Sequence, residues 1–122
     1  MAKILIVDDE QAIREILAMM IEETGTHQIV EADCGRAAIE TIKQHQDISV
    51  VFCDYRMENG NGGDVYRFIH SEGNMVPYVM ISTDRPEDHA ELLGFRDHHP
   101  SNDYLAKPFE LDHLEAIIKK LG

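Results

Sequence analysis

The chain has 122 residues, enough for one domain with a sizeable core, and a formal net charge of -12. This acidity argues against direct binding of nucleic acid or of anionic membranes, because both attract clustered cations, and it favours a basic partner. No apolar stretch approaches the ~20 residues of a transmembrane helix, and the first residues lead straight into a predicted strand. We therefore expect no membrane association, no signal peptide and a cytoplasmic location.

Apolar runs alternate with segments of helical spacing along the whole chain. Strands are predicted at 4–7, 29–32, 48–53, 78–81 and 103–106. The helical stripes between and after them are Ile13, Ile16, Leu17 and Met20; Ala38, Ile39 and Ile42; Val65, Phe68 and Ile69; Ala90 and Leu93; and Leu111, Leu114, Ile117, Ile118 and Leu121. The alternation predicts one α/β domain over residues 1–122, with a parallel sheet covered by helices on both faces.

Polar residues stand where the predicted strands end. They are Asp8, Asp9, Asp54, Ser82, Thr83 and Lys107. In parallel sheets the ligand site lies beyond the carboxyl ends of the strands, so these side chains are expected to converge there. Three clustered carboxylates repel one another unless a divalent cation or an ammonium group lies near them. Hard oxygen ligands, a cation and hydroxyl groups together indicate a site that handles phosphate with magnesium.

Four sequence segments carry a resemblance to a known family. They are KILIVDDE at 3–10, VFCDYRM at 51–57, VMIST at 79–83 and DYLAKPF at 103–109. In this order they resemble the receiver domains of two-component response regulators over essentially the whole chain. The resemblance implies a single doubly wound (βα)5 domain, a flavodoxin-like three-layer sandwich with strand order 2-1-3-4-5.

The resemblance also implies a magnesium site around a phosphoacceptor. Asp54 accepts the phosphoryl group, and Asp9 and Asp54 contact Mg²⁺ directly. The backbone carbonyl of Arg56 supplies a further oxygen, and Asp8 acts through bound water. Mg²⁺ suits such a site because it keeps several waters and needs few carboxylates.

Other residues receive roles in catalysis and switching by the same resemblance. Lys107 pairs with Asp54 and then with the phosphoryl group, and its bond to Pro108 is cis. Ser82 is the switch hydroxyl that moves to the phosphoryl oxygen, and Tyr104 follows by turning inward.

The implied function is a signalling switch. A sensor histidine kinase or phosphotransfer protein donates the phosphoryl group, and the domain, which is not an enzyme acting on other molecules, catalyses its own phosphorylation and slow autodephosphorylation. Phosphorylation then alters the surface of the fourth helix, fifth strand and fifth helix for a partner or an attached output domain. Arg56, Thr83 and Asp84 overlook the phosphoryl group, and pairing of Arg56 with Asp84 is expected to shield it from water.

The chain departs from the family pattern in three places. The loop 58–63 is rich in glycine and is expected to be mobile beside Asp54. The spacing from Ser82 to Lys107 is longer by a few residues, accommodated around 95–102, so an unusual output partner is expected. The switch hydroxyl belongs to serine, where threonine is commoner.

Simpler interpretations exist for each residue taken alone. An aspartate after a strand commonly caps the next helix, which would account for Asp8 or Asp9. Lys107 alone would be assigned to solvent, Ser82 to a backbone hydrogen bond and Tyr104 to strand packing. The acidic pair matched to a third carboxylate, in the family's order, favours the functional interpretation.

Other protein classes fit the sequence less well. A magnesium-dependent phosphohydrolase that forms an aspartyl phosphate needs a second acid where this chain has Arg56. A flavin or nucleotide module needs a phosphate-cradling loop where the acidic segment 8–10 would repel phosphate. A receiver used only for docking would lack one of Asp9, Asp54 and Lys107. The sequence leaves open whether the chain is complete or part of a longer regulator.

Overall fold

The computed structural model describes residues 3–57, 62–73, 76–82 and 102–121. Its strands are β1 (Lys3–Val7), β2 (Gln28–Ala32), β3 (Val50–Asp54), β4 (Tyr78–Ser82) and β5 (Asp103–Ala106), and its helices are α1 (Gln11–Glu23), α2 (Gly35–Gln44), α3 (Gly62–Ser71) and α5 (Leu111–Leu121). The strands form one parallel sheet in the order β2-β1-β3-β4-β5, which confirms the predicted topology. The predicted helix around Ala90 and Leu93 lies outside the described residues.

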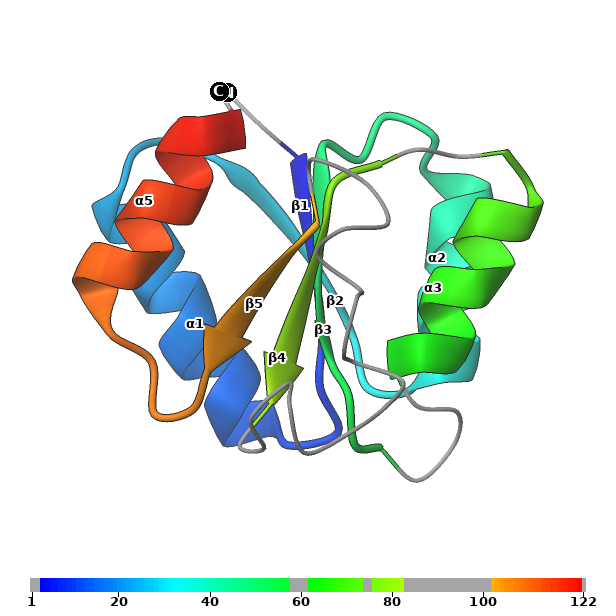
Figure 1. Cartoon of the computed structure of the whole chain (residues 1–122), viewed down its shortest axis with the longest axis horizontal. Coiled ribbons are helices and arrows are strands. Elements are labelled where there is room, and N and C mark those ends of the chain that lie inside the picture. The colour runs from blue at the N-terminus through cyan, green and yellow to red at the C-terminus, as the bar shows by residue number, and fades with distance from the viewer. Residues whose placement is uncertain (1–2, 58–61, 74–75, 83–101, 122) are drawn as a thin grey trace.

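Helices cover both faces of the sheet and complete three layers (Figure 1). Alternate strand residues point to opposite faces. On one face Leu5, Val7, Val51, Cys53, Tyr78 and Met80 pack with Ala38, Ile42, Val65 and Ile69 of α2 and α3. On the other face Ile4, Ile6, Val50, Phe52, Val79, Ile81 and Leu105 pack with Leu17, Ile21, Leu114 and Ile117 of α1 and α5. The continuous apolar runs of the sequence are therefore strands buried on both sides.

Two residues of the predicted apolar stripes lie on the surface instead. Ile16 is 47% exposed and Leu111 is 38% exposed. In α1 the buried positions are Leu17 and Ile21, which are four residues apart, and Ile16 lies about 100° around the helix from Leu17. The stripe predicted for α1 was therefore wider than the surface that packs on the sheet.

Neither cysteine forms a disulfide in the described part of the chain. Cys34 and Cys53 are free thiols, half-buried and buried respectively. Cys34 precedes α2, and its Sγ accepts a hydrogen bond of 3.4 Å from the Ala37 amide. Within the described part of the chain, no helix has both the length and the apolar character needed to cross a membrane.

Candidate functional site

The strand register brings the predicted polar residues to one edge of the sheet. Val7 of β1 pairs with Cys53 of β3, so Asp8 and Asp54 follow neighbouring positions. Ser82, the last residue of β4, pairs with Ala106 of β5, and Lys107 comes next. The register of the paired strands therefore places Asp8, Asp54, Ser82 and Lys107 together at the carboxyl edge of the sheet.

Lys107 joins the two buried aspartates. Its Nζ lies 3.1 Å from Oδ2 of Asp8 and 3.2 Å from Oδ2 of Asp54. Its side chain is only 14% exposed, and its backbone amide donates to the Ser82 carbonyl at 3.1 Å. The bond from Lys107 to Pro108 is cis, as expected. The predicted pairing with Asp54 is thus present, and Lys107 forms a second ion pair, with Asp8.

Two hydrogen bonds and an ion pair fix the position of Asp8. Its backbone amide donates to the Ala32 carbonyl at 3.2 Å, and its Oδ1 accepts from the Glu10 amide at 2.9 Å. The residue is fully buried, and its Oδ2 has the ammonium of Lys107 beside it, but no described residue donates a well-aligned hydrogen bond to this oxygen. A buried carboxylate oxygen with capacity to spare can accept a further cation or a water bound to one.

Burial and crowding keep the acidic residues of the edge partly resistant to ionisation. Desolvation, aided by the charge of Asp8, raises the pKa of Asp54 to about 6, against the opposing effects of Lys107 and of a hydrogen bond from the Arg56 backbone. Burial and then the charge of Asp8 also raise the pKa of Asp9. Desolvation lowers the pKa of Lys107, but the charges of Asp54 and Asp8 outweigh it, so the pKa is raised overall. Lys107 therefore stays charged, and the edge retains an excess of negative charge.

The donor set fits a hard divalent cation. Asp8, Asp9 and Glu10 each offer a carboxylate oxygen, and these oxygens lie within 4.8 Å of one another. Asp9 and Glu10 are exposed, so water can complete the coordination that Mg²⁺ prefers. Glu10 was not among the predicted ligands, and its place directly after the acidic pair is the signal that could have indicated it. The proposed ligand role of the Arg56 carbonyl stays a prediction.

The predicted switch residues occupy different environments. Ser82 is 6% exposed at the edge. Tyr104 is partly buried against the core on the α2 and α3 face. Thr83 and Asp84 lie outside the described residues. So do residues 95–101, most of the segment expected to accommodate the longer spacing from Ser82 to Lys107. The movement assigned to Ser82 and Tyr104 stays a prediction.

Part of the glycine-rich segment is ordered by the site. Gly62 and Gly63 are buried in the first turn of α3, which corrects the expectation that all of 58–63 forms a mobile loop. A Cβ on Gly62 would lie 2.7 Å from the Asp54 carbonyl oxygen and 2.6 Å from Sδ of Met80. Glycine at 62 lets α3 approach the strand that carries the phosphoacceptor candidate.

Sequence reasoning also missed Arg14. Its Nη1 donates to the backbone carbonyl of Asp8 at 2.7 Å, and its Nε donates to Oε1 of Glu31 on β2 at 2.9 Å. The sequence signal for Arg14 is a basic residue near the start of the predicted first helix, soon after the acidic residues 8–10. Only the tertiary structure shows what Arg14 contacts.

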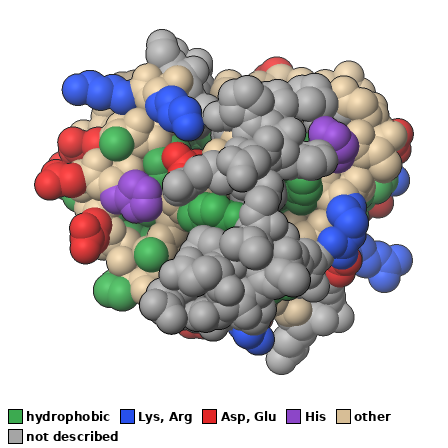
Figure 2. All heavy atoms as spheres, in the orientation of Figure 1, with side chains coloured by type: hydrophobic (Ala, Val, Ile, Leu, Met, Phe, Trp, Pro, Cys, Tyr) green, Lys and Arg blue, Asp and Glu red, His purple; other side chains and the backbone are tan. Residues whose placement is uncertain are grey.

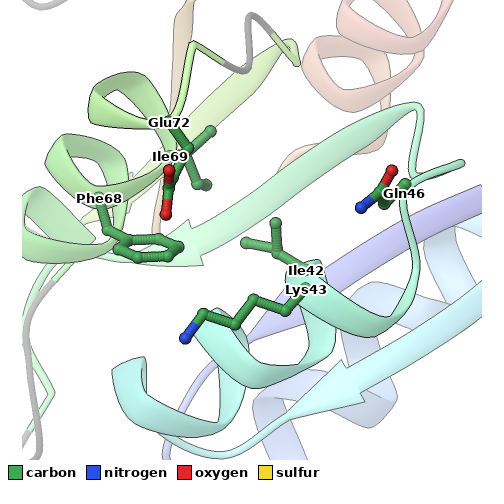
Figure 3. A pocket seen from close by; sticks show the side chains of 6 residues that line it. All are labelled: Ile42, Lys43, Gln46, Phe68, Ile69 and Glu72. Carbon is green, nitrogen blue, oxygen red and sulfur yellow. The ribbon is translucent and has the colours of Figure 1, made fainter.

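A groove between α2 and α3 is separate from the acidic edge. It encloses about 550 Å³ and is lined by Ile42, Lys43, Gln46, Phe68, Ile69 and Glu72 (Figure 3). Lys43 lies over the ring of Phe68, with Nζ 5.4 Å from its centroid. No predicted site residue within the described ranges lines this groove.

Comparisons with known proteins agree with the geometry. The family profile described as response regulator receiver domain matches residues 4–119. A probable transcriptional regulatory protein of Picosynechococcus is 32% identical over 98% of this chain and 49% of that protein, so the chain spans about half of that relative. Chemotaxis protein CheY1 of Helicobacter pylori is 29% identical over 88% of this chain and 86% of its own. The solved structure of a response regulator receiver protein from Pseudomonas putida has a TM-score of 0.83 at 26% identity, over 98% of this chain and 96% of that one.

Proposed function

The chain belongs to the response regulator receiver domain family of two-component systems, and on that premise we propose that Asp54 accepts a phosphoryl group from a phosphohistidine. The observation that carries the proposal is the ammonium of Lys107, which lies 3.1 and 3.2 Å from oxygens of Asp8 and Asp54 at the carboxyl edge of the sheet. The donor is a sensor histidine kinase or a phosphotransfer protein.

The chain's residues have the properties that such a transfer needs. An ionised oxygen of Asp54 attacks phosphorus, the bond from phosphorus to the histidine nitrogen breaks, and the electron pair of that bond goes to the nitrogen. With its pKa at about 6, Asp54 is mostly ionised at pH 7. Lys107 neutralises charge that develops on the phosphoryl oxygens, and Ser82, at the same edge, donates a hydrogen bond to one of them.

Magnesium completes the proposed site. Asp9 and Asp54 would bind Mg²⁺ directly, with Asp8 through water and the Arg56 carbonyl as a further ligand. When bound, the ion supplies positive charge against the phosphoryl oxygens. The buried Oδ2 of Asp8, which lacks an aligned donor, and the adjacent carboxylates of Asp9 and Glu10 support this assignment.

The output of the switch is a change in binding. Phosphorylation adds about one to two negative charges to an edge that is already acidic. We propose that Ser82 and Tyr104 respond by moving inward and that the surface of β5, α5 and the predicted fourth helix then changes its affinity for a partner or an attached output domain. The acidic composition favours a basic protein surface over direct contact with nucleic acid or membrane. The two free cysteines suit a reducing compartment, so we place the domain in the cytoplasm.

Phosphorylation by a small donor tests the acceptor. Incubation with acetyl phosphate and Mg²⁺ is expected to add one phosphate, about 80 Da by intact mass. Asp54→Asn should take up none, because the nucleophile is gone. Asp47→Asn is the matched control, since Asp47 is bound to Lys3 before β3 begins, and it should be labelled like the parent. Stoichiometric labelling of Asp54→Asn would overturn the assignment.

The lifetime of the label tests the residues proposed to influence hydrolysis. Arg56 is exposed beside Asp54, and we propose that it shields the acyl phosphate together with Thr83 and Asp84. Arg56→Ala is expected to lose phosphate about tenfold faster, which corresponds to ~1.4 kcal/mol of barrier. Arg67→Ala, which removes an exposed arginine from α3, should decay at the parent's rate. Equal rates in the parent and Arg56→Ala, within about twofold, would rule out shielding.

A further inference from the structure

We propose that Arg14 is a positioning residue that holds the segment Asp8 to Glu10 in the arrangement required for a divalent cation. The inference rests on the proposed magnesium site and assigns a role to a residue that neither binds the ion nor reacts. It starts from the two hydrogen bonds of the guanidinium, to the Asp8 carbonyl at 2.7 Å and to Glu31 at 2.9 Å.

The guanidinium connects three elements at the edge of the sheet. Arg14 lies in the first turns of α1, which begin at the edge where the strands end (Figure 1). One donor reaches the residue that follows β1 and another reaches Glu31 of β2. A guanidinium is planar and rigid. Its bond to Glu31 therefore fixes the direction of the second donor, which restrains the Asp8 carbonyl.

Backbone hydrogen bonds also restrain the segment at its two ends. The Asp8 amide donates to the Ala32 carbonyl at 3.2 Å, and the Glu10 carbonyl accepts from the amides of Ile13 and Arg14 at 3.1 and 3.2 Å. α1 begins after Glu10, whose side chain makes no capping hydrogen bond to the first turn. Asp9 and Glu10 are exposed. The Glu10 amide donates to Oδ1 of Asp8, so the position of Asp8 decides where the next two residues lie. A bond of 2.7 Å from a charged donor to the Asp8 carbonyl therefore adds a side-chain restraint at the residue on which the position of the acidic segment depends.

The position of Arg14 also explains why an arginine is tolerated near a cation site. Its side chain is only 15% exposed, and its charge is partly neutralised by Glu31, which is 45% exposed. Its donors face a carbonyl and Glu31, while the ammonium facing the oxygens of Asp8 and Asp54 belongs to Lys107. The two cations of the site thus have separate roles, one toward the backbone and one toward the carboxylates.

Magnesium affinity distinguishes positioning from a simple effect of charge. Removing a positive charge near a cation site should tighten Mg²⁺ binding if charge alone matters. If Arg14 positions the acidic segment, Arg14→Met should instead weaken binding, by about tenfold or more. Arg14→Lys keeps the charge but cannot make both hydrogen bonds of the guanidinium. The Mg²⁺ affinity of this variant should therefore fall between those of the parent and Arg14→Met.

The experiment measures Mg²⁺ dissociation constants by calorimetry for the parent, both Arg14 variants and Arg67→Met, which removes an exposed arginine from α3. Amide hydrogen exchange without metal is recorded on the same proteins. We expect the Glu10 amide to exchange at least tenfold faster in Arg14→Met, the amides of β3 to stay protected, and Arg67→Met to match the parent in both measurements.

The outcomes separate this inference from the proposed function. Equal or tighter Mg²⁺ binding by Arg14→Met, or unchanged exchange of the Glu10 amide, overturns the positioning role while the magnesium site stands. If the parent itself binds no Mg²⁺, the metal part of the proposed function fails and the inference fails with it. Weaker binding that appears only in variants with an unfolded core, seen as rapid exchange in β3, would also overturn it.

Discussion

Asp54, the proposed phosphoacceptor, is an aspartate in a buried position. It is 6% exposed, and its pKa is raised to about 6, chiefly by desolvation. Lys107 opposes that rise but does not cancel it. If Asp54 is the phosphoacceptor, as proposed, the residue that must be ionised to attack phosphorus is less stable in its ionised form than it would be in the unfolded chain.

The pH dependence of stability follows from this shift. Because the pKa is raised above the ordinary value of 3.8, the native state holds the proton more tightly than the unfolded chain. The stabilisation is complete below pH ~4 and is lost as the pH rises through ~6. In EDTA, Asp54→Asn should therefore gain stability relative to the parent between pH 4.5 and pH 7, reaching about 1 to 3 kcal/mol.

Urea unfolding at a series of pH values measures the difference between the two proteins. Asp47→Asn serves as a control, because Lys3 lowers the pKa of Asp47, the opposite direction, and its removal should give no gain at pH 7. A stability difference between parent and Asp54→Asn that does not change between pH 4.5 and pH 7 would contradict the raised pKa.

At the scale of elements, α3 is fitted closely to β3 and β4. The Gly62 amide donates to the Tyr55 carbonyl at 3.0 Å, and the buried Tyr78 hydroxyl donates to the Gly62 carbonyl at 2.8 Å. The ring of Tyr66 packs edge-on against Tyr78, and the side-chain amide of Asn102 donates to the Tyr66 hydroxyl at 2.9 Å. The start of α3 is therefore tied both to the residue after Asp54 and to the chain that enters β5.

A methyl group at position 62 tests this fit. Gly62→Ala places Cβ against the Asp54 carbonyl, which is backbone and cannot rotate away. We expect a loss of about 1 to 3 kcal/mol of stability and slower uptake of phosphate from acetyl phosphate, because Asp54 must shift. Urea unfolding and intact-mass kinetics measure the two effects.

Gly73→Ala is the matched control for that substitution. Gly73 has open space around its Cβ position but a φ of +74°, so alanine there is strained by about 1 kcal/mol. The Gly73→Ala variant should take up phosphate at the parent's rate despite its lower stability. If Gly62→Ala also takes up phosphate at the parent's rate, the close approach has no bearing on Asp54.

At the scale of the whole molecule, negative charge is the dominant electrostatic feature. The net charge is -12, and acidic side chains are prominent on the side of α1 and α5 (Figure 2). Self-repulsion of this kind destabilises the compact state and is relieved by cations. A cation bound at one site must be distinguished from general screening, which any salt provides.

Magnesium should raise the melting temperature of the free domain at constant ionic strength. Linkage gives ~2.7 kcal/mol at a hundredfold excess over the dissociation constant, provided the unfolded chain does not bind. Asp9→Asn should lose most of this gain. Glu115→Gln removes one exposed negative charge from α5 and should keep it. Thermal unfolding in MgCl₂ and in NaCl of equal ionic strength measures the effect, and equal curves for the parent would count against the site.

Much of the fold could be predicted because its signals are local. The apolar runs at 4–7 and 50–53 are continuous since their strands are buried on both faces, and the polar residues that end them mark the edge of the sheet. The same reasoning, with the family's strand order, indicated that Asp8, Asp54 and Lys107 would meet there, and they do.

What the sequence alone determined about this protein is the succession of buried strands and helices and the residue types at the strand ends, because both depend on consecutive residues. The order of the strands in the sheet came from the resemblance to the receiver family. Only the tertiary structure decided that Lys107 contacts Asp8 as well as Asp54, that Arg14 binds the Asp8 carbonyl, and that Gly62 lies against the Asp54 carbonyl. These contacts join residues from different elements at distances set by packing and register, and no spacing within the sequence specifies such distances.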